Sequence, residues 1–96
     1  MSYRFAPAAL AEFVGAVQWY LTEGGPAPAE RFEYEVHRAL RLLALMPGLG
    51  TPAYRGTRIW PVRDFPYTLV YRIKSGDIDV IAVAHQSREP GYWHGR

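Results

Sequence analysis

The sequence contains no cysteine, a single lysine and no apolar run approaching the length of a membrane span. Without cysteine, neither a disulfide framework nor a thiolate metal site can form. The histidines, His37, His85 and His94, are too scattered to predict a zinc site, so we expect no metal and no cofactor. A spanning helix needs about 20 apolar residues, and the N-terminus has no apolar signal-peptide segment. We therefore expect a soluble, cytoplasmic protein without membrane contact.

Composition and charge indicate one small globular domain, residues 1–96, because 49% of the residues are hydrophobic. The net charge of +2 is unevenly distributed. Residues 1–50 hold four arginines against five glutamates, whereas residues 51–96 hold six arginines and one lysine against four acids. A basic half is typical of chains that meet nucleic acid or an acidic protein. An excess of this size is also ordinary for half a domain, so charge alone does not choose a function.

The first half of the chain predicts a short strand and two helices. Residues 2–5 alternate polar and aromatic side chains, as a strand does, and Pro7 suits the first position of a helix. That helix should end before Gly24, and a second should run from about 28 to 46, so that the connection between them makes an antiparallel hairpin. The expected inner faces are Leu10, Phe13, Val14, Val17, Tyr20 and Leu21 in the first helix, and Phe32, Val36, Ala39, Leu40 and Leu43 in the second.

From residue 51 the apolar period changes to two, which predicts strands at 58–62, 67–74 and 77–85. Pro61 should confine the first of these to an edge or a bulge. A two-residue turn at Ser75-Gly76 would pair Arg72 with Asp79, Val70 with Ile81 and Thr68 with Val83. The helix-facing side would then be Tyr67, Leu69, Tyr71, Ile73, Ile78, Val80, Ala82 and Ala84, and the other side Thr68, Val70, Arg72, Asp79, Ile81, Val83 and His85. The predicted class is α+β: a strand, a helical hairpin, then three antiparallel strands in one sheet packed on the hairpin.

Polar chemistry gathers where the last strand ends, in the stretch AVAHQSREPGYWHGR, residues 82–96. A ribonuclease that works without metal needs a base, an acid and cations around the phosphate. The residues of suitable type are His85, Arg72, Arg63, Arg88 and Tyr92. Each also has a structural interpretation: Arg72 can pair with Asp79, His85 can terminate its strand through hydrogen bonds, and Arg88 can bind an acid. Tyr92 and Trp93 can anchor the tail.

Three segments at their spacing resemble the RelE/ParE superfamily, the toxins of bacterial type II toxin–antitoxin pairs. They are Phe-Pro-Tyr at 65–67, Leu-Val-Tyr-Arg at 69–72 and His-x-x-Arg-x-Pro-x-Tyr-Trp at 85–93. RelE-like members cleave messenger RNA in the ribosomal A site, whereas ParE-like members block DNA gyrase. The nuclease members carry an arginine directly before the Leu-Val-Tyr segment, where this chain has Thr68, and another just past the last strand, where it has Gln86. Losing such a cation costs about 2 to 4 kcal/mol of transition-state stabilisation, which favours the ParE-like branch.

The resemblance implies a toxin that poisons DNA gyrase by binding and is neutralised by a cognate antitoxin, without sequence-specific DNA binding by this chain alone. The alternative is a ribosome-dependent endoribonuclease using His85, Tyr92, Arg88 and Arg63, and a third possibility is a toxin fold that has lost toxicity. In this superfamily the antitoxin lays a helix on the hairpin and often adds a strand. The antitoxin-binding candidates are Leu42, Leu45, Met46, Ile59, Trp60 and Val62. The target-contact candidates are Arg72, His85, Arg88, Trp93 and Arg96.

Overall fold

A single residue, Gly25, connects the two helices of the hairpin. The computed structural model describes residues 2–96, in which strand β1 (Tyr3–Phe5) leads into α1 (Pro7–Gly24) and then α2 (Pro26–Leu45). Only Gly25 separates the helices, and its φ of 84° with ψ of −172° is a conformation open almost solely to glycine. α2 therefore begins two residues earlier than predicted, because Pro26 fits the first helical turn, where no N–H is needed. Neither helix could cross a membrane, and no other helix of residues 2–96 could do so.

The predicted inner face of α2 is confirmed, since all five of its expected residues are buried. The prediction for α1 is wrong in part. Phe13 is buried, but its buried companions on α1 are Ala9 and Ala16. The side chains of Leu10, Val14 and Leu21 are 47%, 43% and 50% exposed. Small alanines let α1 approach its neighbours closely, so its larger aliphatic residues lie along its flank.

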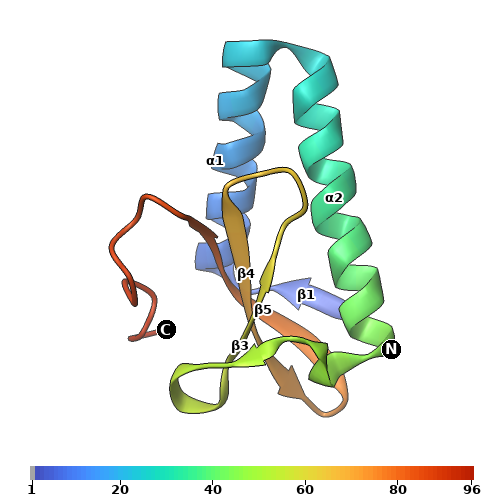
Figure 1. Ribbon diagram of the computed structural model, residues 1–96, viewed down its shortest axis with the longest axis vertical. Helices are drawn as coiled ribbons and strands as arrows, with labels where there is room; N and C mark the ends of the chain where they lie inside the picture. Colours follow the sequence, from blue (N-terminus) through green and yellow to red (C-terminus); the bar gives the residue numbers. More distant parts are fainter. Residues whose placement is uncertain (1) are drawn as a thin grey trace.

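The sheet has five strands in the order β1-β5-β4-β3-β2 and the helices pack on one of its faces, which confirms the predicted class (Figure 1). The remaining strands are β2 (Thr51–Pro52), β3 (Arg58–Pro61), β4 (Tyr67–Lys74) and β5 (Asp77–His85). β1 runs parallel to β5, and the other neighbours are antiparallel. β2 was not predicted. It pairs only with the first two residues of β3, so Trp60 and Pro61 keep an edge without a strand beside it among the residues that the structure describes.

A β-bulge at Ile81 overturns half of the predicted register. The turn is correct: Ser75 and Gly76 have φ of 53° and 83°, as a tight hairpin requires, and Arg72 pairs with Asp79. Beyond Tyr71 and Val80, however, Val70 pairs with Ala82, which leaves Ile81 as the extra residue.

The bulge also exchanges the two faces of β5 beyond it, because successive strand residues alternate sides. Val83 joins the core under the helices, whereas Ala82 packs on the opposite face with Val70 and Trp93. His85 lies directly opposite Tyr67, and not one residue out of step as predicted. The predicted placement of Ala82 on the helix-facing side, and of Val83 on the other side, is therefore wrong.

Tyr71 joins the end of α2 to the sheet. Its ring is fully buried, and its hydroxyl donates to the Pro47 carbonyl at 2.7 Å and accepts from the Gly50 N–H at 2.9 Å. A Cβ on Gly50 would collide with this hydroxyl, so glycine is required by the close approach. These contacts fix the backbone that follows Leu45 and Met46, two of the antitoxin-binding candidates.

Candidate functional site

The carboxylate of Glu12, on α1, collects four hydrogen bonds beside the bulge. Its Oε1 accepts from the backbone N–H of Val83 at 3.0 Å and from Arg96 Nη1 at 2.8 Å. Its Oε2 accepts from the Tyr92 hydroxyl at 2.7 Å and from Arg96 Nη2 at 3.0 Å. Arg96 Nη1 also donates to the Ile81 carbonyl at 3.1 Å. The bulge lies beyond the pairing with β1. Glu12 and Arg96 therefore provide hydrogen-bond partners for the Val83 N–H and the Ile81 carbonyl, which have no ladder partner there.

This hydrogen bonding fixes the protonation states of the cluster. Burial alone would raise the pKa of Glu12, but the hydrogen bonds from Arg96, Tyr92 and Val83 outweigh it and hold that pKa below its ordinary value. Burial and the neighbouring Glu12 carboxylate raise the pKa of Tyr92 to about 12. At neutral pH, Glu12 is therefore an anion and Tyr92 a hydroxyl donor. We call Glu12, Tyr92 and Arg96 the tail clamp.

The C-terminal tail, residues 86–96, turns back toward the sheet after β5 and does not extend away from it (Figure 1). Trp93 is buried against Val70 and Ala82, on the sheet face opposite the helices. Further along, the His94 ring stacks on Tyr54 with centroids 3.8 Å apart and an interplanar angle of 10°. The tail is thus held by the clamp, by the packing of Trp93 and by the stacking of His94 on Tyr54. This agrees with the interpretation of Tyr92 and Trp93 as anchors.

His85 behaves as a hydrogen-bonded strand terminator. Its Nδ1 accepts from the Ser87 backbone N–H at 3.0 Å and lies 2.8 Å from the Ser87 hydroxyl. Because a backbone N–H can only donate, Nδ1 is the acceptor, and the neutral ring carries its proton on Nε2. The ring also stands edge-on to Tyr67, with centroids 4.9 Å apart.

The structure places three of the four ribonuclease candidates, His85, Arg88 and Tyr92, in the lining of one hollow, and Arg63 in that of another. His85 and Arg88 line the same hollows, but the Arg88 guanidinium stacks on the Tyr92 ring at 3.8 Å. Arg63 lines a different hollow with Leu42 and Trp60. Tyr92 directs its hydroxyl to Glu12. Arg63 is therefore separated from the other three, and of those three the Tyr92 hydroxyl and the Arg88 guanidinium already have partners within this chain.

The ion pair expected between Arg72 and Asp79 is wrong, although the two residues do face each other across the strands. Among residues 2–96, the cation that pairs with Asp79 is Arg4 of β1, at 3.6 Å. Arg72 instead donates from Nη1 to the Arg96 carbonyl at 3.4 Å, a long contact to the tail. The parallel strand β1, absent from the predicted pairing, supplies the competing cation.

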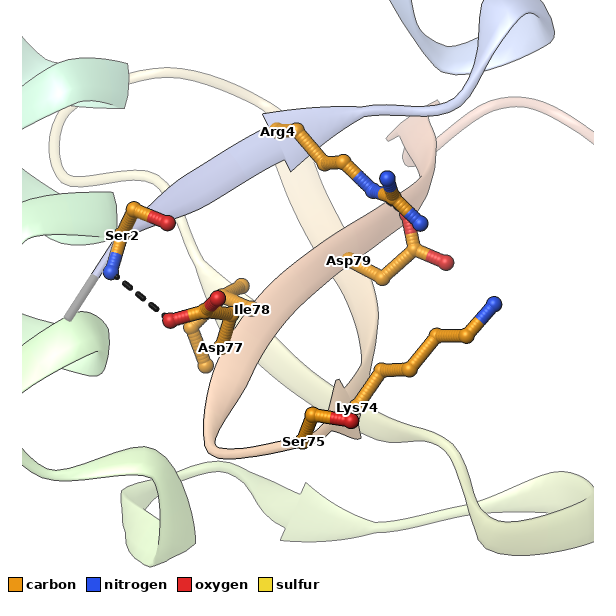
Figure 2. A pocket seen from close by; sticks show the side chains of 7 residues that line it. All are labelled: Ser2, Arg4, Lys74, Ser75, Asp77, Ile78 and Asp79. Atoms are coloured by element: carbon orange, nitrogen blue, oxygen red, sulfur yellow. Dashed lines mark hydrogen bonds and ion pairs between the residues drawn. The ribbon is translucent and has the colours of Figure 1, made fainter.

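Figure 2 shows the hollow at the β4–β5 hairpin, where Arg4 reaches toward Asp79 and the Ser2 nitrogen donates to Asp77 at 3.0 Å. Lys74 faces Asp77 across the turn. Two cations and two acids balance each other here, so the hollow has no net charge with which to attract a charged ligand. We assign it no function.

The antitoxin-binding candidates fall into three groups. Leu45 and Met46 are 72% and 53% exposed. Leu42 and Trp60 line the hollow that also contains Arg63. The remaining two are covered: Val62 is buried in the core under the helices, and Ile59 packs against the cluster around Trp93. Val62 is therefore corrected to a core residue, and Ile59 to a partly covered one.

The fold and the tail place this chain in a known class of protein. The family model described as ParE toxin of type II toxin–antitoxin system, parDE, matches residues 3–90. The chain therefore belongs to the ParE toxin family, as its resemblance predicted. Among solved structures, the chromosomal ParDE TA system from P. aeruginosa matches with a TM-score of 0.76 and 20% identity, over 88% of this chain and 95% of that one. At this identity the match shows the fold. No curated protein matches the sequence.

The tail clamp predicts a pH-dependent stability that a single substitution should remove. Because the pKa of Glu12 is lowered by folding, its contribution is complete above the ordinary value of 4.5 and is lost as pH falls through the lower folded value. Because the pKa of Tyr92 is raised from 10.0 to about 12, its contribution is complete below pH 10 and is lost as pH rises through about 12.

We expect Glu12→Gln to reduce the free energy of unfolding by about 1 to 3 kcal/mol near neutral pH, since hydrogen bonds to a charged group are lost. Urea unfolding of both proteins from pH 3 to 9 measures this difference. It should be constant above pH 5 and shrink in more acidic solution. Glu23→Gln, on the exposed end of the same helix, is the control and should change little. A difference that persists undiminished at pH 3 would contradict the clamp.

Proposed function

We propose that this toxin acts by binding DNA gyrase, does not cleave RNA, and is held inactive by a cognate antitoxin. The observation that carries the proposal is that Tyr92 and Arg96 both bind the carboxylate of Glu12. Both belong to the tail clamp, where Tyr92 donates to Glu12 and Arg96 neutralises it at 2.8 Å. A phenol whose pKa is about 12 is a poor proton acceptor near neutral pH. Tyr92, which matches the C-terminal tyrosine of the nuclease members, therefore holds the tail in place.

The shortage of cations around His85 supports the same conclusion. Of the described residues that line the two hollows containing His85, only Arg88 carries a positive charge, and Glu89 lies in one of these hollows as well. Thr68 and Gln86, also lining residues, stand where the nuclease pattern has arginine. A phosphorane carries negative charge, and each missing donor costs about 2 to 4 kcal/mol of its stabilisation. Family membership then favours gyrase, the target of the ParE-like branch that the chain resembles.

The surface at the end of α2 supports the antitoxin as partner. Leu45 lies beside Tyr3, Ala44 and Arg41 around an open, mainly apolar hollow. On the flank of α1, Leu10, Val14 and Leu21 follow at spacings of four and seven residues, which puts them on one side of that helix. Each region offers apolar side chains to the apolar side of an amphipathic helix. The edge at Trp60 and Pro61, beyond the reach of β2, could accept a short strand.

The direct test is a gyrase supercoiling assay with the purified toxin. We expect supercoiling to stop as toxin is titrated in. Equimolar antitoxin should restore it, because the bound antitoxin would cover the gyrase-binding surface of the toxin or block access to it. Unimpaired supercoiling at a large excess of folded toxin would contradict gyrase as the target.

The antitoxin surface is tested separately by Leu45→Ser. Leu45 is 72% exposed, so the fold should tolerate the change, whereas a buried contact to the antitoxin would be lost. We expect antitoxin affinity, measured by isothermal titration calorimetry, to fall about tenfold or more. The matched control is Ile73→Thr, which also places a hydroxyl at an exposed aliphatic position (45%), on β4, and Ile73 is not among the described residues that line the hollow around Leu45. Equal affinities for the unaltered toxin and Leu45→Ser would remove this position from the interface.

A further inference from the structure

One of the two hollows that His85 lines lies on the helix-covered side of the sheet end. It forms where the C-terminal half of α1 meets the start of β4 and the end of β5. We call it the Trp19 hollow. Its lining residues are Trp19, Tyr20, Pro66, Tyr67, His85, Ser87 and Arg88.

Aromatic packing supports the walls of this hollow, although Trp19 itself is 58% exposed. Trp19 stands edge-on to Tyr20, with ring centroids 5.2 Å apart. Tyr20 in turn packs against Phe32 and Phe65 of the main core, both at 5.2 Å. The exposed indole is therefore supported by a chain of rings that reaches the interior. A binding surface that is already ordered does not lose side-chain entropy when a partner arrives.

The residue types in the hollow are those that dominate protein–protein binding energy. Tryptophan, tyrosine and arginine are enriched at the few positions that carry most of the affinity of an interface. The inward side of α1, centred on Phe13, leaves Trp19 outside the core, so packing within this chain does not account for a large ring here. An indole beside an arginine at the mouth of a hollow fits a protein partner.

The charges of the hollow define that partner further. Of its described lining residues, none is acidic and Arg88 alone is cationic. A single cation is too little to neutralise a polyphosphate or a nucleic acid strand. One carboxylate can pair with Arg88, while an apolar side chain packs on Trp19.

We propose that the Trp19 hollow is the contact site for the toxin's protein target, and that it takes an aliphatic or aromatic side chain next to an acidic residue. This inference rests on the proposed function, because it assumes a toxin that acts by binding a protein. It also divides the target-contact candidates into residues that hold the tail and residues that line the hollow. Arg72, Trp93 and Arg96 hold the tail, whereas His85 and Arg88 line the hollow. Trp19 is added to them.

The test compares Trp19→Ala with Tyr34→Ala, since these rings are 58% and 57% exposed on α1 and α2. Each full-length variant is expressed without antitoxin and growth is followed. Each is also purified, and its gyrase inhibition and antitoxin affinity are measured. We expect Trp19→Ala to lose growth arrest, to inhibit gyrase at least about 30-fold less, and to keep antitoxin affinity within about threefold. Tyr34→Ala should keep its toxicity.

A second pair tests the charge. Arg88→Glu should weaken target inhibition about tenfold or more, because it would repel the partner's carboxylate. Lys74→Glu, at the hairpin turn, should leave inhibition unchanged. Circular dichroism and antitoxin affinity confirm that each variant is folded.

The outcomes separate the two proposals. Full toxicity of Trp19→Ala would overturn the hollow alone, and so would a parallel loss of antitoxin binding, which would assign the hollow to the antitoxin. Growth arrest that depends on Trp19 without gyrase inhibition would overturn gyrase and support the hollow. An unaltered toxin that does not arrest growth would overturn the proposed function and this inference with it.

Discussion

The carboxylate of Glu12 is the contact on which the C-terminal end of this molecule depends. A bulge at Ile81 turns the last residues of β5 over and leaves backbone groups beyond the reach of β1. Glu12 accepts a hydrogen bond from one of these groups, the Val83 N–H. Its carboxylate also accepts hydrogen bonds from Tyr92 and Arg96. One side chain of α1 thus determines both how the last strand ends and where the tail lies.

This arrangement relates a toxin of the ParE family to the nuclease branch of its superfamily. The same fold can present an arginine-rich site or a covered sheet face, depending on what the tail does. Here Trp93 covers the face opposite the helices, and the tyrosine that resembles a nuclease residue is a structural donor. At that end the exposed Arg88 and Trp19 and the half-buried His85 line one hollow.

The sequence predicts the elements with strong periodicity and misses those that depend on distant partners. The inner face of α2, the hairpin turn and the three C-terminal strands follow from local pattern, and all appear in the structure. The face of α1 was mistaken because alanines at a close contact look less apolar than the leucines beside them. The bulge has no local signal, since the carboxylate that stabilises it is 71 residues away along the chain. His85 and Arg88 were found by their residue type, whereas Glu12 and Trp19 resemble ordinary helix-surface positions.

The central claim is that the toxin acts by contact and leaves RNA intact, since its tail residues are used to hold the tail. The most direct measurement is primer extension on translated messages after the toxin is induced without antitoxin. The account predicts full-length products while growth stops. Cleavage within codons at the ribosomal A site would contradict it, because the guanidinium groups and the tyrosine would then have to leave the positions described.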